Sequence, residues 1–182
     1  MLDPVLLDWH GTADLDANLI ADLIELRRIL EPEAARLAAD RATAGDLAAI
    51  GAAYERMEAA VGGQGDYVEA DAAFHTTVLM ASHNVFLIQL KDALLRLLRL
   101  GFTTTSRHPN APASTLPYHA SLLHRLEARD GTGAADAVHV LIERNLHHLR
   151  GVLGKDARKT ASGTGMALTA TPNGAKADKH AH

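Results

Sequence analysis

Two side chains able to hold a metal ion, Asp71 and His75, stand one helical turn apart in this sequence. Residues four apart share a face of an α-helix, and apolar residues such as Phe74 and Val78 surround this pair. An ionised carboxylate facing a helix-bundle core is costly unless something compensates its charge. A divalent metal held by carboxylate and imidazole is one solution, and His119, on a later apolar stripe, is a third candidate ligand.

The same spacing has a second interpretation, which needs no metal. Asp and His four residues apart often form a hydrogen-bonded pair on a helix. Taken alone, the spacing favours this pair over a metal site, because most histidines are not ligands. Any metal site must use His, Asp or Glu, since the chain has no cysteine.

The composition of the 182 residues favours packed helices. The chain is 47% apolar, and Ala, Leu, Val and Ile carry that content rather than aromatic residues. No window approaches the roughly 20 uninterrupted apolar residues of a membrane span, and the first residues lack a signal-peptide pattern. We therefore expect a cytoplasmic protein with no membrane partner.

Charge and motifs exclude two classes of function. From Lys155 onward there are five Lys or Arg against two Asp, so the net charge of −4 leaves the preceding residues at −7. An acidic body lacks the electrostatic footprint of a nucleic-acid-binding surface, so this chain alone is not expected to bind DNA. The sequence also lacks a nucleophile motif, a phosphate-binding glycine loop and an HExxH pattern, and we expect no enzyme.

Helical periodicity and turn residues divide the chain into an extended arm (1–14), one domain (15–153) and a disordered tail (154–182). Pro32 interrupts the first apolar stripe, which predicts a kink or two helices meeting at Glu31-Pro32. Thr43, Asp66 and Asn84 are typical helix N-caps. The predicted helices cover 15–38, 44–61, 67–79, 85–101, 116–129 and 134–153, with a loop over 106–117. Their number and short connections predict an all-α fold, an antiparallel bundle of six or seven helices.

Several segments, in this order and spacing, resemble the FCD domain. This is the C-terminal effector-binding domain of fatty-acid-regulator-type members of the GntR transcription-factor superfamily. The segments that carry the resemblance are 24–35, 37–39, 69–75, 82–87 and 119–123, within roughly residues 15–150. Residues 2–9 and 103–106 are similar to the sugar-acid branch of the family, which includes galactonate-type regulators.

The resemblance implies partners as well as a fold. The family's winged helix-turn-helix domain would precede Met1, so we expect this chain to lack it and to reach DNA only through such a domain. The family also implies a homodimer and a small carboxylate or sugar-acid effector.

For the metal, the resemblance implies the ligands Asp71, His75 and His119. Family members often add a fourth ligand, a His that corresponds to Leu141 here, and leucine cannot ligate. His139 is near in sequence, but it lies about 200° around the helix and is expected to face elsewhere. Three ligands with open positions suit Zn²⁺, Mn²⁺ or Ni²⁺.

Four further residues are candidate effector contacts. Arg27 lies within the apolar stripe of the first helix, where its guanidinium could bind an effector carboxylate. Alternatively, it pairs with Asp or Glu on a facing helix or extends to the edge of the core. Arg28 is a second candidate, one position off the stripe. Thr105 and Ser106 could donate hydroxyls to a polyol, or could simply end the long helix as it enters the loop.

The function that these expectations define is ligand sensing in a bacterial transcriptional regulator, through a small carboxylic acid and a divalent metal. Two alternatives remain open at this point. One is a small metal-dependent enzyme that uses the same three ligands. The other is a fragment without a DNA-binding domain that acts only as a dimerisation partner of full-length relatives.

Overall fold

The structure is a computed structural model that describes residues 17–92, 94–96, 98–99 and 111–163, with side chains described between 21 and 148. Its helices are α2 (Ala17–Arg41), α3 (Ala44–Val61), α4 (Tyr67–Ala81), α5 (Val85–Gln89), α7 (Ala111–Glu127) and α8 (Gly131–Gly163). Helical turns also cover the described residues between Lys91 and Arg99. No strand occurs within these ranges, and the predicted all-α fold is confirmed.

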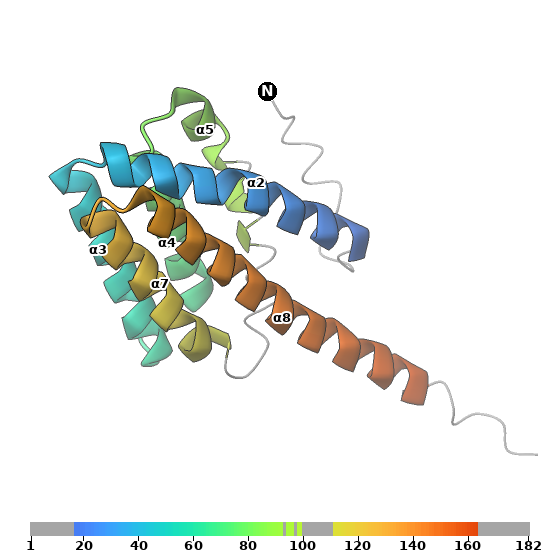
Figure 1. Cartoon of the computed structure of the whole chain (residues 1–182). Coiled ribbons are helices and arrows are strands. Elements are labelled where there is room, and N and C mark those ends of the chain that lie inside the picture. The colour runs from blue at the N-terminus through green and yellow to red at the C-terminus, as the bar shows by residue number, and fades with distance from the viewer. Residues whose placement is uncertain (1–16, 93, 97, 100–110, 164–182) are drawn as a thin grey trace, which may run out of the picture.

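The helices pack around a common apolar core. α8 packs along α2 and α7, and α3 packs against α4 and α7, while α4 also contacts α2 (Figure 1). Burying one large apolar side chain contributes about 1.5–3 kcal/mol to folding, so this core is the main source of stability. Among the described residues, the largest fully buried apolar side chains are Ile50, Met57, Phe74, Leu98, Leu122, Leu126, Leu141 and Ile142.

Polar caps start three helices where the sequence predicts them. The Thr43 hydroxyl accepts the Asp46 N–H at 3.1 Å while the Asp46 carboxylate accepts the Thr43 N–H at 2.8 Å, which is a capping box. Asp66 and Asn84 accept the first free N–H groups of α4 and α5. The Asp66 cap matters most for function, because it fixes the register of the helix that carries Asp71 and His75.

Two predicted helix boundaries differ from the structure. α2 runs through Pro32 as one helix, so the alternative of two helices meeting at Glu31-Pro32 is wrong. A proline removes only one backbone hydrogen bond, and the buried Ala34 and Ala35 keep the following turn packed. The single helix expected after Asn84 is divided, because α5 ends at Gln89 and a turn precedes the next helical residues.

The start of α7 and the end of α8 also differ from prediction. α7 begins at Ala111, inside the predicted loop, because Pro112 occupies the first turn, where its missing N–H has no helical partner to lose. α8 continues to Gly163 rather than ending at 153, through a segment rich in the helix formers Lys, Arg and Ala. Its C-terminal part extends beyond the other helices (Figure 1). The predicted arm (1–14) and residues 164–182 lie outside the described residues.

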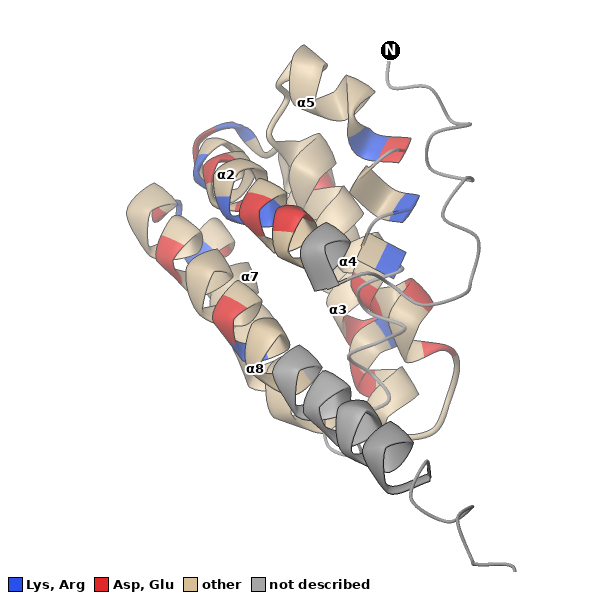
Figure 2. Ribbon diagram, turned by 90° about the vertical axis from the view of Figure 1, so that its right-hand side faces the viewer, with Lys and Arg blue, Asp and Glu red and all other residues tan. Residues whose placement is uncertain are grey.

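The charged residues of the described helices are mixed rather than of one sign. Acidic and basic positions follow one another along α2 (Figure 2), and Arg36 pairs there with Glu33 and Asp40. None of the described helices combines the length and apolar character that crossing a membrane requires.

Candidate metal centre

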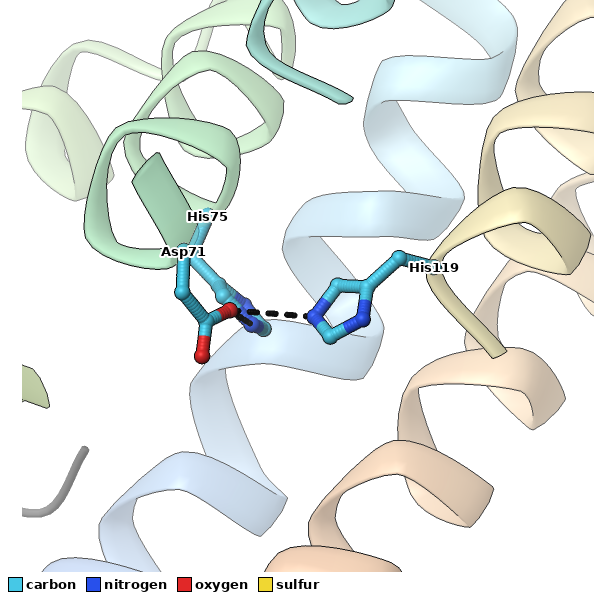
Figure 3. Close-up of side chains that lie close together, drawn as sticks. All are labelled: Asp71, His75 and His119. Carbon is cyan, nitrogen blue, oxygen red and sulfur yellow. Dashed lines mark ion pairs between the residues drawn. The ribbon is translucent and has the colours of Figure 1, made fainter. Parts of the chain in front are cut away.

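Two helices bring the three predicted ligands together inside the bundle. Asp71 and His75 project from one face of α4, and His119 projects toward them from α7 (Figure 3). Their exposed fractions are 4%, 7% and 1%. α4 holds this position because most of its residues are apolar and buried, so an Asp and a His on that face have no route to solvent.

The three side chains converge through one atom each. The Asp71 Oδ1 atom lies 3.0 Å from His119 Nε2 and 3.3 Å from His75 Nε2. The two imidazole planes are nearly perpendicular, at 84°, with their centroids 5.5 Å apart. Phe74 packs edge-on against both rings, at 5.9 and 5.2 Å, and supplies an apolar wall beside them.

Hydrogen bonds on the far edges of the rings determine which nitrogen faces Asp71 as a lone pair. His119 Nδ1 lies 3.0 Å from the Thr115 carbonyl oxygen, and a carbonyl can only accept, so Nδ1 carries the proton. His75 Nδ1 lies 3.1 Å from Glu31 Oε2, and an ionised carboxylate likewise only accepts. In the neutral rings, both Nε2 atoms therefore present lone pairs to the Asp71 oxygen.

This arrangement needs a positive charge at its centre. Among the described residues, Asp71 Oδ1 and His119 Nε2 are buried and make no hydrogen bond of acceptable angle, despite their 3.0 Å separation. Buried lone pairs that face one another repel unless a proton or a cation lies between them. Two imidazole nitrogens and one carboxylate oxygen are a donor set that Zn²⁺, Mn²⁺ and Ni²⁺ accept. The residues present therefore fit a divalent metal.

Protons can meet the same need. Burial would raise the pKa of Asp71, but the imidazoles of His119 and His75 hold it below its ordinary range. Burial lowers the pKa of His75, yet Glu31 and Asp71 more than offset that effect and raise it to about 9. The metal-free site is thus stable with a protonated His75 at neutral pH, and an incoming metal must displace that proton.

Glu31 is a residue of this site that the sequence reasoning missed. It lies on α2, is 6% exposed, and accepts from Arg27 Nε at 2.6 Å as well as facing His75. Burial raises the pKa of Glu31, but Arg27 and His75 outweigh that effect and lower it to about 2. One signal was available, because Arg27 and Glu31 stand four residues apart on an apolar stripe, as Asp71 and His75 do.

The candidate effector residues occupy different environments. Arg27 is 2% exposed and pairs with Glu31, four residues later on its own helix. Arg28 is on the surface and bonds Glu143 of α8, with its Nε 3.0 Å from Oε1. Thr105 and Ser106 lie outside the described residues. The effector role of all four residues stays a prediction.

The fourth ligand position remains apolar in the structure. Leu141 is fully buried in the core, and His139 is exposed, as its place on the helix suggested. The donor set among the described residues is therefore Asp71, His75 and His119. A cavity of about 10 Å³ beside His75, lined also by Glu31, has room for one water molecule.

Comparison with known families agrees with this architecture. The model of the FCD domain matches residues 22–144, and the chain belongs to this family of effector-binding domains of GntR-type transcriptional regulators. The galactonate operon transcriptional repressor of Escherichia coli (strain K12) is 36% identical over 151 residues, a match covering 82% of this chain and 66% of the repressor. The Glc operon transcriptional activator of the same strain is 31% identical over 141 residues, covering 70% and 55%. The chain thus spans less than two thirds of these relatives.

Two solved structures share the fold. Streptococcus agalactiae GntR superposes with a TM-score of 0.63 at 24% identity, over 76% of this chain and 63% of that chain. E. coli McbR/YncC superposes with a TM-score of 0.66 at 21% identity, over 76% and 67%. At these identities the likeness establishes the architecture of the bundle and carries no information about ligands.

Proposed function

We propose that this chain is the ligand-sensing domain of a GntR-type transcriptional regulator, and that it binds a small sugar acid through a divalent metal held by Asp71, His75 and His119. The observation that carries the proposal is the convergence of two imidazole nitrogens on a buried carboxylate oxygen. It occurs within a domain whose family senses effectors.

A metal held by three protein ligands would supply a Lewis-acid centre with open positions for the carboxylate and hydroxyl oxygens of an acid. The protein's own contribution is to fix the ring planes and to exclude water. Phe74 and the buried surroundings of α4 do this from one side. A 36% identical relative is a galactonate operon repressor, so an aldonic acid such as galactonate is our first candidate ligand.

Ligand entry would have to rearrange the bundle. Within the described part of the chain, the cavity beside His75 has room for about one water molecule, which is far too little for a sugar acid. Binding would therefore favour an arrangement in which the helices around the site have parted. A ligand shifts such an equilibrium only by its difference in affinity for the two arrangements, a few kcal/mol for an effective switch. We propose that homodimerisation and an attached DNA-binding domain convert this shift into regulation.

A thermal-shift titration tests the proposal. The melting temperature is measured with Zn²⁺, Mn²⁺ or Ni²⁺ alone, with chelator, and then with galactonate and other sugar acids in each condition. A metal at about 100 times its Kd should stabilise the fold by about 2.7 kcal/mol, and one acid should add stability only when the metal is present. Asp71→Asn should abolish both effects, while Asp40→Asn, an exposed control, should keep both. An acid that stabilises equally with chelator would contradict the metal-mediated site.

A further inference from the structure

We infer that Glu31 is a positioning residue of the proposed metal site: it orients the His75 ring and fixes its tautomer, and Arg27 in turn holds Glu31. The inference rests on the proposed function, because it concerns how the same three ligands are held. It assigns to α2 a part in a site whose ligands all come from α4 and α7.

The two edges of the His75 ring have different neighbours. Nε2 faces Asp71 Oδ1 at 3.3 Å, while Nδ1 faces Glu31 Oε2 at 3.1 Å. Because the carboxylate of Glu31 bonds the far edge of the ring, it does not share the space where the three ligand atoms converge. It keeps the proton on Nδ1 and leaves Nε2 as the ligand atom, and it makes the imidazole a stronger donor.

Arg27 holds the Glu31 carboxylate in place. Its Nε lies 2.6 Å from Glu31 Oε1 and its Nη2 lies 3.4 Å from Oε2. The Glu31 carboxylate therefore accepts from two donors, the Arg27 guanidinium and the Nδ1–H of His75. Both Arg27 and Glu31 are almost fully buried, so an unpaired charge on either side chain would be costly.

The two imidazoles are held in unequal ways. His119 donates to the backbone carbonyl of Thr115, one turn earlier on its own helix, so the hydrogen bond that orients this ring comes from α7 itself. His75 depends on a side chain from a different helix. Glu31 is thus the contact through which α2 determines the geometry of a ligand on α4, and its removal should weaken metal binding without touching a ligand.

The test is a calorimetric titration of the full chain with Mn²⁺ and with Zn²⁺, with His180→Ala and His182→Ala in every sample to remove two tail ligands. Glu31→Ala should bind the metal roughly 10 to 100 times more weakly than the parent. Glu31→Gln keeps an acceptor oxygen for Nδ1–H and should fall between the two. Glu33→Gln is the matched control, since Glu33 is exposed and pairs with Arg36 on the same helix, and it should bind as the parent does.

A second variant controls for misfolding. It is needed because Glu31→Ala leaves the buried charge of Arg27 without this carboxylate. Arg27→Leu/Glu31→Leu removes both charges and should show the same 10- to 100-fold loss. Proton NMR of the Zn²⁺-loaded chain gives a readout that fold stability does not move. The Nδ1–H of His75 should give a slowly exchanging low-field resonance in the parent and none in the double variant.

The outcomes separate this inference from the proposed function. If Asp71→Asn binds metal as tightly as the parent, the proposed site itself is wrong. If Asp71→Asn loses the metal while both Glu31 variants and the double variant bind at parental affinity, with the low-field resonance retained, the positioning role of Glu31 is overturned. Loss of affinity in the Glu31 variants with parental binding by Glu33→Gln would support it.

Discussion

Raising the pH should lower the free energy of unfolding of the metal-free protein, because one buried side chain, His75, loses a proton. Burial lowers the pKa of this imidazole, but the carboxylates of Glu31 and Asp71 raise it to about 9, against an ordinary 6.5. A group whose pKa is raised by folding stabilises the fold fully below the unfolded pKa. That contribution is lost as the pH rises through the folded value, so the window runs from pH 6.5 to about 9.

The size of the effect follows from the gap between the two pKa values. Each unit corresponds to about 1.36 kcal/mol, so the free energy of unfolding should fall by about 3 kcal/mol across the window. Solvent screens the charge of His75 little, because this side chain is only 7% exposed. For a protein of this length, the same loss lowers the melting temperature by roughly 6–12 °C.

Urea unfolding in the presence of chelator, between pH 6.5 and 9, measures this dependence. The His75→Gln variant is the control, because every other titrating group remains in it, and subtracting its profile isolates the imidazole. Saturating Zn²⁺ should reverse the trend, since the ion replaces the proton and binds better as the pH rises. Equal slopes for the parent and His75→Gln with chelator would contradict the assignment of this pH dependence to His75.

Three further predictions concern the scaffold, and urea unfolding measures each of them. Phe74→Ala should lower the free energy of unfolding by about 3–5 kcal/mol, because a fully buried ring is lost. It should also reduce the metal-induced rise in melting temperature, because the ring packs on both imidazoles. An unchanged rise would contradict the role of Phe74 as an apolar wall of the site. Asp46→Ala should lower the free energy of unfolding by about 1 kcal/mol through loss of the capping box. The Thr43 hydroxyl and N–H lower the pKa of Asp46 from 3.8 to about 2, so this difference between parent and variant should disappear as the pH falls from 3.8 to about 2. Arg28→Ala should change stability by less than about 1 kcal/mol, because both Arg28 and Glu143 are exposed, and a larger loss would mean that the α2–α8 contact depends on this pair.

The features that the sequence predicts well are local ones. The caps at Thr43, Asp66 and Asn84 depend on a side chain and the N–H groups two or three residues later, so the residue types alone suffice. Asp71 and His75 share a helix face for the same reason. Prolines mislead, because Pro112 in a first turn and Pro32 inside a helix are both accommodated.

The remaining part of the site depends on packing between helices. His119 joins the pair from α7; its apolar stripe makes it a candidate ligand, but only the family resemblance places it with Asp71 and His75. The sequence marks Glu31 only as the residue before Pro32, because nothing in the periodicity of α2 reveals that His75 of α4 lies 3.1 Å away. The sequence also leaves two roles open for Arg27, because an arginine on an apolar stripe can form an ion pair inside the core or bind an effector.

Pro32 directly follows the carboxylate that holds His75. Proline has no N–H, so the carbonyl of Arg28 lacks its helical partner and this turn of α2 has one backbone hydrogen bond fewer than a regular turn. From Glu31 back to Ala17 the helix is a rod of about 21 Å. A tilt of about 5° at this turn would move the N-terminal end of α2 by about 2 Å. A small shift of the His75 ring, transmitted through Glu31, would therefore produce a larger displacement where α2 begins.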